Sequence, residues 1–241
     1  MSSIQVVILA AGKGTRLGRP HPKPLTVLTD DGRTIITQQL DNIRAALGED
    51  ARVMVVVGFK FDMIMEAVPD VVFAYNEDYS DTNTNRSLLR ALRNTVEGPV
   101  IWMNGDVVFD PVVLERLKPF LADDRSAIAV NTAATAEEEV KYTVDAHGHV
   151  DALSKQVRDA LGEAVGVNLV SAADKLALIR RLGECDDQDY FERGIELAIE
   201  HDGMQVTPVD ISDLFAVEVD NAEDLERANE AQREYTRARQ A

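Results

Sequence analysis

A glycine-rich segment with nearby cationic side chains lies close to the N-terminus of the sequence. Residues 9–17 read LAAGKGTRL, and residues 22–25 read PKPL. Glycine lets a backbone approach a ligand closely, and the backbone N–H groups of such a loop point at anions. Lys13, Arg16 and Lys23 add positive charge for several phosphate oxygens. The segment therefore predicts a cradle for a triphosphate.

Two other phosphate-binding loops do not fit this segment. A Walker A loop requires G-x-x-x-x-G-K-[ST], which the sequence lacks. The Rossmann fingerprint G-x-G-x-x-G fails because Gly12, Gly14 and Gly18 leave one residue too many. A turn whose glycines serve only backbone geometry is the alternative. The arginine and the PKPL motif that follow the glycines favour the phosphate site.

The composition is that of a globular chain with a strong acidic excess. Of its 241 residues 45% are hydrophobic and 28% charged, and the formal net charge is −17. Nucleic acids and anionic membranes attract positive surfaces, so we expect neither as a partner. No apolar run reaches the roughly 18–20 residues of a membrane span, and the N-terminus is not typical of a signal peptide. A single cysteine excludes an internal disulfide, which favours a cytoplasmic location.

Hydrophobic periodicity predicts strands that alternate with helices in the first half of the chain. The expected strands are 4–10, 53–57, 71–75, 99–104 and 127–131, and the expected helices are 34–47, 61–68, 88–95 and 112–121. This alternation implies right-handed crossovers and a parallel sheet, whose ligands lie beyond the carboxyl ends of the strands. The phosphate cradle follows the first strand and lies at such an end.

The second half of the chain predicts a mixed pattern. Residues 142–155 alternate as an antiparallel hairpin does, and three glutamates at 137–139 are typical of solvated surface. Further strands are expected at 162–167, 205–209 and 215–220, and further helices at 171–182, 186–201 and 221–228.

Asp106 follows the expected strand 99–104 and Gly105 directly. An acid at this point meets the carboxyl edge of the sheet, where Mg²⁺ binds carboxylate oxygens while it bridges phosphates. Capping of a turn is the alternative role for this aspartate.

The motif LAAGKGTRL followed by PKPL resembles the signature of nucleotidyltransferases that activate sugar-1-phosphates and small phosphorylated alcohols. The resemblance covers about residues 4–228 and implies that an NTP reacts with a phosphorylated acceptor and pyrophosphate is released. It implies a single-domain, Rossmann-like, three-layer α/β sandwich of the GT-A-like nucleotidyltransferase type, with a mainly parallel mixed sheet and a small antiparallel hairpin region. Residues 1–230 would form this domain and residues 231–241 a polar C-terminal tail.

The resemblance also implies roles for individual residues. Arg16, Lys23 and Lys155 are the expected catalytic residues; Lys155 ends a V-x-x-x-S-K segment that delivers a lysine to the acceptor phosphate or the α-phosphate. Asp106 and Asp220 are the expected Mg²⁺ ligands, the latter from its place in EVDNAEDL. The expected nucleotide-binding residues are Leu9, Ala10, Ala11, Gly12, Lys13, Gly14, Asn76, Asn85, Ser87 and Gly105.

A polar loop at residues 76–87 bears on the nucleobase. It resembles the N-x-x-Y…N-x-x-S-L arrangement of a branch that includes the phosphocholine, aminoethylphosphonate and inositol-1-phosphate cytidylyltransferases. Asparagine and serine side chains can pair with both the donor and the acceptor edges of a pyrimidine. This loop and the resemblance to the cytidylyltransferase branch together imply CTP as the preferred nucleotide. Ser87 or Asn85 is expected to cap the following helix.

The acceptor is expected at Asp189, Tyr190 and Glu192, because an acid with aromatic neighbours can hold a cationic head group. Alternatively, Phe191 belongs to the core and the acids are charges favoured at a helix N-terminus. A UTP- or dTTP-dependent sugar-1-phosphate nucleotidyltransferase and a non-catalytic nucleotide- or sugar-sensing domain of this fold are the alternative functions. A homodimer is left open.

Overall fold

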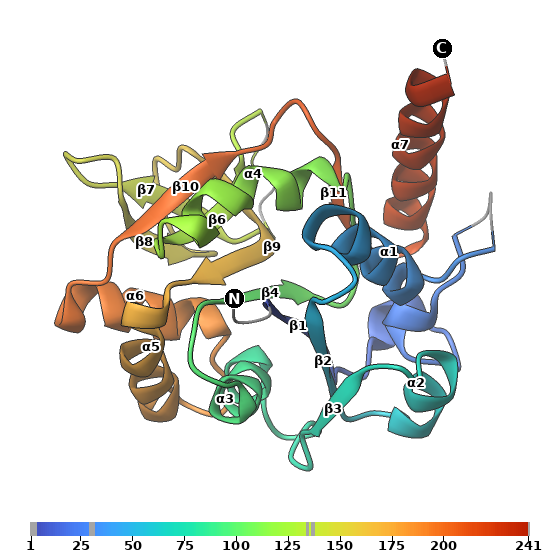
Figure 1. Cartoon of the computed structure of the whole chain (residues 1–241), viewed down its shortest axis with the longest axis horizontal. Coiled ribbons are helices and arrows are strands. Elements are labelled where there is room, and N and C mark those ends of the chain that lie inside the picture. The colour runs from blue at the N-terminus through green and yellow to red at the C-terminus, as the bar shows by residue number, and fades with distance from the viewer. Residues whose placement is uncertain (1–3, 29–31, 134, 136–137, 241) are drawn as a thin grey trace.

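A mixed sheet of nine strands lies at the centre of the computed structural model, which describes residues 4–28, 32–133, 135 and 138–240 (Figure 1). Seven strands follow one another across it: β10 (Val206–Asp210), β6 (Ser126–Asn131), β9 (Gly162–Val170), β4 (Val100–Asn104), β1 (Gln5–Ala10), β2 (Arg52–Val57) and β3 (Val72–Tyr75). β9 is antiparallel to β4 and β6, and the other neighbours on this path are parallel. The predicted mainly parallel mixed sheet is confirmed.

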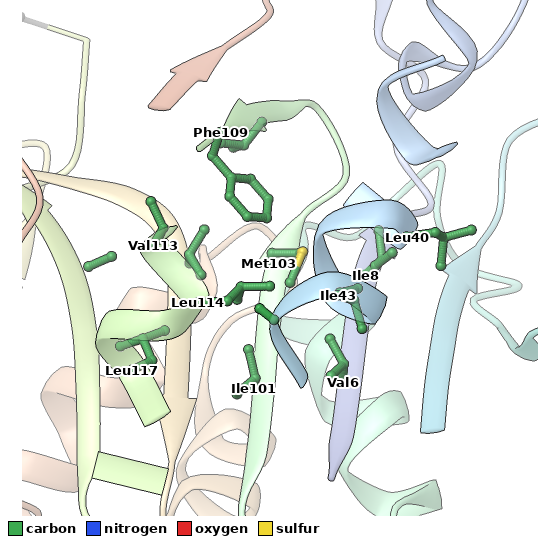
Figure 2. Packing of buried hydrophobic residues seen from close by; sticks show 14 of the residues in the cluster. Val6, Ile8, Leu40, Ile43, Ile101, Met103, Phe109, Val113, Leu114 and Leu117 are labelled. Atoms are coloured by element: carbon green, nitrogen blue, oxygen red, sulfur yellow. The ribbon is translucent and has the colours of Figure 1, made fainter. Parts of the chain in front are cut away.

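Helices cover both faces of this sheet. One face carries α1 (Ile35–Leu47), α2 (Phe61–Ala67) and α4 (Val112–Ala122), and the other carries α3 (Thr84–Asn94), α5 (Ala172–Glu184) and α6 (Phe191–Asp202). All six residues of β1 are buried, as a strand between two helical layers requires. Figure 2 shows the core between the sheet and the first group of helices, where Ile43 of α1 and Leu114 of α4 lie near Met103 of β4.

Two smaller β structures adjoin the main sheet. β7 (Lys141–Val144) and β8 (Val150–Ser154) form the predicted antiparallel hairpin, and β7 also pairs with the start of β9. β5 (Val107–Phe109) pairs antiparallel with β11 (Ala216–Glu218).

The last helix, α7 (Ala222–Gln240), is buried in its first turns, and further along the ring of Tyr235 meets that of Phe215 edge to face, with centroids 5.9 Å apart. Leu225 and Ala228 are buried with Val108 and Val219 in a small third core. The end of the helix points away from the body of the molecule, and the helix continues past residue 230, the expected end of the domain, into the expected tail (Figure 1). In the part of the chain that is described, no helix has the length and apolarity needed to cross a membrane.

α3 begins one turn earlier than the apolar periodicity predicts. It starts at Thr84 rather than Leu88, and Asn83 is its N-cap, with the side-chain oxygen accepting from the N–H of Thr84 at 2.8 Å. The expected caps, Ser87 and Asn85, lie within the helix and are buried. The expectation was wrong because the first turn of α3 is polar and is buried by another loop, so hydrophobic spacing does not reveal it.

α6 begins later than predicted, at Phe191 rather than at residue 186. Residues 186–190 form a loop, and two of its carbonyls are used by α3: Asp186 accepts from Asn85 Nδ2 at 2.6 Å and Asp187 from the N–H of Asn83 at 2.8 Å. These contacts between distant segments replace the helical hydrogen bonds that the local sequence favours.

Gln39 of α1 holds the turn that follows β4. Its side-chain amide donates to the carbonyls of Asn104 at 2.8 Å and Val107 at 2.9 Å, which flank Gly105 and Asp106. The residue is fully buried. A helix behind the sheet thus fixes the backbone on which Asp106 is carried.

We predict that Gln39→Leu lowers the free energy of unfolding by about 1–3 kcal/mol, because two buried carbonyls lose their donor. Urea unfolding monitored by circular dichroism measures the change. Arg44→Leu, on the exposed face of the same helix, is the matched control and should stay within about 0.5 kcal/mol of the wild type. Equal unfolding midpoints for Gln39→Leu and the wild type would contradict the role given to Gln39.

Candidate active site

A cleft of about 390 Å³ opens at the carboxyl ends of β1 and β4. Most of the residues to which the sequence assigns a role line it: Leu9, Ala10, Gly12, Lys13, Gly14, Arg16, Lys23, Gly105, Asp106, Lys155, Tyr190 and Glu192. An adjoining cavity of about 80 Å³ is lined by further members of this set: Ala11, Asn76 and Ser87. Segments from both halves of the chain therefore meet at one edge of the sheet, as expected for ligand sites of parallel sheets.

Three acids form a cluster at this edge. Asp106, Glu218 and Asp220 each offer a carboxylate oxygen, and these oxygens lie within 4.8 Å of one another. The pairing of β5 with β11 brings them together, because Val107 is the partner of Glu218, and the N–H of Val219 donates to the carbonyl of Asp106 at 2.9 Å. Asp106 precedes one strand and Asp220 follows the other, so the antiparallel register places both at the same end.

Two cations balance this cluster. Lys23, only 8% exposed, donates from Nζ to Asp106 Oδ2 at 3.1 Å and also to Asp220 Oδ1. Arg16 Nη1 lies 2.7 Å from Asp220 Oδ2. Burial alone would lower the pKa of Lys23, but the charges and hydrogen bonds of Asp106 and Asp220 outweigh it and hold that pKa above its ordinary value. The ammonium therefore stays charged near neutral pH.

The donor set fits a divalent cation. Carboxylate oxygens are the ligands that Mg²⁺ prefers, and three of them converge here. Glu218 extends the expected pair to three, and sequence reasoning missed it. Glu218 lies two residues before Asp220, but β11 ends at Glu218 and is too short for an alternating pattern to be recognised in the sequence. Burial and the charges of Asp106, Glu139 and Asp220 raise the pKa of Glu218 well above its ordinary value.

Glu139 also lines the cleft, which contradicts the prediction that residues 137–139 are all solvated surface. Glu138 is exposed as expected, and residue 137 lies outside the described residues. Burial, with the charges of Glu163 and Asp220, raises the pKa of Glu139, and Lys155 opposes the shift. The run of like charges predicted side chains that face solvent, whereas the fold directs the side chain of Glu139 toward the cleft.

Lys155, Tyr190 and Glu192 meet at the far end of the cleft. Lys155 Nζ lies 5.1 Å from the centroid of the Tyr190 ring. Glu192 is 8% exposed, and its Oε2 has no hydrogen-bond partner among the described residues. Burial raises the pKa of Glu192 to about 7, partly offset by a hydrogen bond to its own backbone and by the charge of Lys155. A buried carboxylate oxygen without a partner favours a ligand that brings a donor.

Phe191 belongs to the core, as one of the two interpretations of this region expected. It is 1% exposed, and its ring meets that of Trp102 edge to face, with centroids 5.6 Å apart. It also lines the cleft between Tyr190 and Glu192. The packed ring therefore fixes where the two polar neighbours lie.

The polar loop before α3 contributes fewer free groups than its composition suggests. Asn76 Nδ2 donates to Ser87 Oγ at 3.1 Å, and both side chains line the smaller cavity. Asn85 is fully buried; its amide donates to the carbonyl of Asp186, and its oxygen accepts from the N–H of Arg86. Asn85 is among the lining residues of neither cavity.

Asp189 likewise lines neither cavity, and its Oδ2 accepts from the N–H of Asp186 at 2.9 Å. In contrast, Tyr79, Thr82, Asn83 and Thr84 line both. Sequence reasoning did not select these four, although all belong to the polar loop that it identified.

Comparisons with known proteins agree with this geometry. The MobA-like NTP transferase domain matches residues 6–176, more than half of the chain. Over 94% of its residues the chain is 30% identical to CMP-5'-(3-aminopropyl)phosphonate synthase of Streptomyces rubellomurinus, and it spans 38% of that relative's length. It is 27% identical over 92% of its residues to the bifunctional protein GlmU of Bdellovibrio bacteriovorus, of which it spans 50%. The chain thus spans half or less of the length of these curated relatives.

Solved structures share the fold at low sequence identity. The inositol-1-phosphate CTP transferase of T. maritima superposes with a TM-score of 0.78 at 16% identity, covering 96% of this chain and 95% of that one. The CTP:phosphocholine cytidylyltransferase of Streptococcus pneumoniae gives 0.73 at 20% identity, with coverage of 95% and 98%. The predicted family resemblance is confirmed: the chain belongs to the MobA-like NTP transferase domain family of nucleotidyltransferases.

Proposed function

We propose that the protein is a Mg²⁺-dependent cytidylyltransferase that joins CTP to a small phosphonate or phosphorylated acceptor bearing a cationic amine, with release of pyrophosphate. One observation carries this proposal. The glycine-rich cradle, Asp106 and Glu218 of the three-acid cluster, and the Lys155–Glu192 end all line a single cleft of about 390 Å³, and Asp220 lies beside it within the cluster. That volume is within the range of small-molecule sites.

The choice of CTP is supported by the polar wall and by relatives. Thr82 and Thr84 supply hydroxyl groups beside the cradle, and a hydroxyl can both donate to and accept from a pyrimidine edge, whereas the amide of Asn83 already bonds the N–H of Thr84 and the carbonyl of Gln188. The relative from S. rubellomurinus is named for a CMP-linked product, and the two structural neighbours are named for CTP.

The acceptor class is supported by opposite charges at the far end of the cleft. Lys155 provides a cation for the phosphonate or phosphate group. Glu192 and Glu139 provide carboxylates for an ammonium group, and the ring of Tyr190 adds an aromatic face. A molecule with an anionic group and a cationic amine satisfies both sets, whereas a simple phosphate monoester would leave the buried Glu192 unpaired.

The chemistry in this proposal is a displacement at phosphorus. An oxygen of the acceptor forms a bond to the α-phosphorus of CTP while the bond from that phosphorus to the bridging oxygen of pyrophosphate breaks. The attacking oxygen is anionic near neutral pH, so it needs no general base, and the protein acts by positioning and charge neutralisation. Lys13 and Arg16 would hold the β- and γ-phosphates, Lys23 the α-phosphate, and Lys155 the acceptor.

The metal in this proposal would be held by Asp106, Glu218 and Asp220. When bound, Mg²⁺ neutralises phosphate charge as it develops on the leaving group. Lys23 contacts both aspartates and lies in the same cleft, so its ammonium can exchange a carboxylate for a phosphate oxygen.

A pyrophosphate-release assay tests the substrates. CTP, UTP, dTTP and ATP are each paired with 2-aminoethylphosphonate, phosphocholine, inositol-1-phosphate and glucose-1-phosphate. We expect the highest kcat/KM for CTP with an amine-bearing acceptor. A preference for UTP or dTTP with glucose-1-phosphate would establish the sugar-phosphate alternative, and nucleotide binding without pyrophosphate from any pair would establish a sensing domain.

We predict that Asp106→Ala and Asp220→Ala each lower kcat by at least about 10³-fold, because the charge that stabilises the transferred phosphate is lost. Removal of divalent metal by EDTA should abolish turnover, and added Mg²⁺ should restore it in the wild type and in the control variant but not in the two site variants. Asp62→Ala, an exposed acid of α2, is the control. Near-normal pyrophosphate release by both site variants would refute the mechanism.

The raised pKa of Glu192 leads to a pH-dependent acceptor affinity. The carboxyl binds an ammonium only when ionised, so protonation as the pH falls through about 7 weakens binding. From about pH 8 to about pH 6 we predict that the KM for 2-aminoethylphosphonate rises by about tenfold more than the KM for ethylphosphonate, which lacks the amine. Glu192→Gln should remove this difference. Parallel pH profiles for the two acceptors in the wild type would exclude an ammonium at Glu192.

A further inference from the structure

Hydrogen bonds join the two sides of the cleft. We call residues 82–84, on the side proposed for the base, the nucleotide wall, and residues 190–192, on the side proposed for the acceptor, the acceptor wall. The N–H of Asn83 donates to the carbonyl of Asp187 at 2.8 Å, and the N–H of Phe191 donates to Thr84 Oγ1 at 3.2 Å. Asn83 and Thr84 line the side proposed for the base, and Phe191 lines the side proposed for the acceptor. Two segments about 100 residues apart in sequence therefore form one unit.

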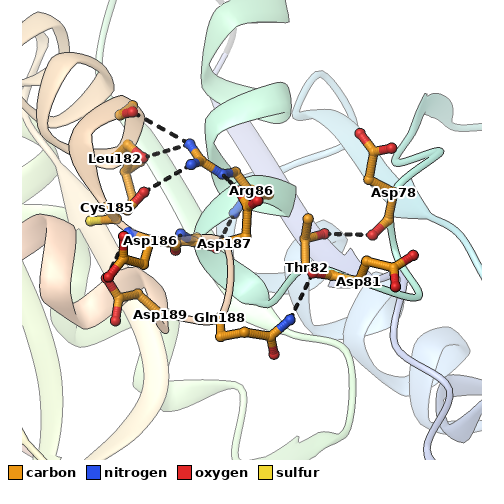
Figure 3. Close-up of polar contacts among 12 residues, drawn as sticks. Asp78, Asp81, Thr82, Arg86, Leu182, Cys185, Asp186, Asp187, Gln188 and Asp189 are labelled. Atoms are coloured by element: carbon orange, nitrogen blue, oxygen red, sulfur yellow. Dashed lines mark hydrogen bonds and ion pairs between the residues drawn. The ribbon is translucent and has the colours of Figure 1, made fainter.

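Arg86 lies at the centre of this joint (Figure 3). Its Nε donates to Asp187 Oδ1 at 2.8 Å, its Nη1 to the carbonyl of Leu182 at 3.2 Å, and its Nη2 to the carbonyl of Cys185 at 2.8 Å. The side chain reaches from α3 to the end of α5 and into the loop that follows. All three guanidinium nitrogens of Arg86 thus donate to acceptors within residues 182–187.

The carbonyl contacts are the important part of this arrangement. The last carbonyls of a helix have no partners within it, and a cation near them also interacts favourably with the helix dipole. α5 ends at Glu184, so Leu182 and Cys185 present such carbonyls. The ion pair with Asp187 adds less, because the Asp187 side chain is 65% exposed and exposed pairs contribute little.

The segment that Arg86 holds leads directly into the acceptor wall. Five residues, 186–190, connect Cys185 to the start of α6, where Tyr190 and Glu192 line the cleft. The end of this connection is fixed by Phe191 against Trp102. Its beginning is held by Arg86 together with Asn83 and Asn85, which donate to the carbonyls of Asp187 and Asp186. Loss of Arg86 would release the end of α5 and the side chain of Asp187, and the bonds from Asn83 and Asn85 would then hold the beginning of the loop without this support.

We propose that Arg86 is a positioning residue for the acceptor: it contacts neither substrate but fixes the loop 186–190 and thereby Tyr190 and Glu192. This inference rests on the proposed function of that end of the cleft. It assigns acceptor affinity to a side chain on the helix that also bears the nucleotide wall.

Amide hydrogen exchange tests the anchor without reference to any substrate. In Arg86→Gln, we expect the peptide that covers residues 185–192 to exchange at least about tenfold faster than in the wild type, while peptides of β1 and β4 are unchanged. Arg116→Gln is the matched control. Arg116 is similarly exposed, bonds both oxygens of Asp213 and one backbone carbonyl, and lines neither cavity. Unchanged exchange at 185–192 in Arg86→Gln would overturn the inference whatever the acceptor is.

Steady-state kinetics with CTP and 2-aminoethylphosphonate test the consequence. For Arg86→Gln we expect the KM of the acceptor to rise by about tenfold, with kcat and the KM of CTP within about threefold of the wild type. A merely structural role would lower the amount of active enzyme and hence the apparent kcat, and would leave the acceptor KM unchanged. That second pattern would overturn the inference.

Two further variants keep the test decisive. Arg86→Lys, which keeps the charge with fewer donors, should recover part of the acceptor affinity and serves if Arg86→Gln does not fold. Asp187→Asn removes the ion pair but leaves the carbonyl contacts, so its acceptor KM should stay near the wild-type value. Full loss of affinity in Asp187→Asn would overturn the importance given to the carbonyls. Failure of the wild type to release pyrophosphate with any acceptor would count against the proposed function, and the exchange experiment would still decide the role of Arg86.

Discussion

Repulsion among three carboxylates is the constraint on which the rest of the site depends. Asp106, Glu218 and Asp220 converge within 4.8 Å, and unit charges this close repel one another by several kcal/mol where water is partly excluded. Lys23 and Arg16 compensate this repulsion from the segment that follows β1. The glycine-rich loop with the PKPL segment and the acid cluster are thus electrostatic partners, because Arg16 and Lys23 each pair with an acid of the cluster. Because the chain as a whole carries a charge of −17, these cations act locally against an acidic background.

The ion pair between Lys23 and Asp220 also links the beginning of the fold to its end. Lys23 and Asp220 are 197 residues apart in sequence, yet they touch. β11 reaches this point only because it pairs with β5, which Gln39 of α1 holds from behind. A small two-stranded sheet at the edge of a large one therefore determines whether the cluster forms, and α1 supports it without facing the cleft.

Much of the fold could be predicted because its strands are buried on both faces. The apolar run that ends at Ala10 marks β1 clearly, and the glycines after it mark a ligand loop. Asp106 could be predicted for the same reason, since it follows a buried strand directly. In each case a local pattern carries the information, and no distant contact changes the outcome.

The parts that could not be predicted depend on contacts between distant segments. The start of α3 is polar, and only the burial of Asn85 under the loop 186–190 makes it helical. Glu139 lies in a run of acids that looks like surface, and the fold alone decides that it faces the cleft. Glu218 belongs to a strand of three residues, too short for a period to be recognised. Local patterns cannot report a surface that a remote segment later covers.

The reversed direction of β9 determines which segments can bring side chains to the cleft. Parallel strands bring only their carboxyl ends to the ligand edge, whereas β9, antiparallel to β4, brings its amino end there. The β7–β8 hairpin is attached to that amino end, because Lys141 and Tyr142 pair with Glu163 and Gly162. Lys155 reaches the cleft from the end of this hairpin, whereas Tyr190 and Glu192 reach it from the start of α6. Tyr142, Val150 and Leu153 of this hairpin are buried in the same core as Val7 and Leu9 of β1. The segment that brings Lys155 to the cleft is therefore packed against the strand that leads into the glycine-rich loop, so a change in the hairpin core would be felt on both sides of the cleft.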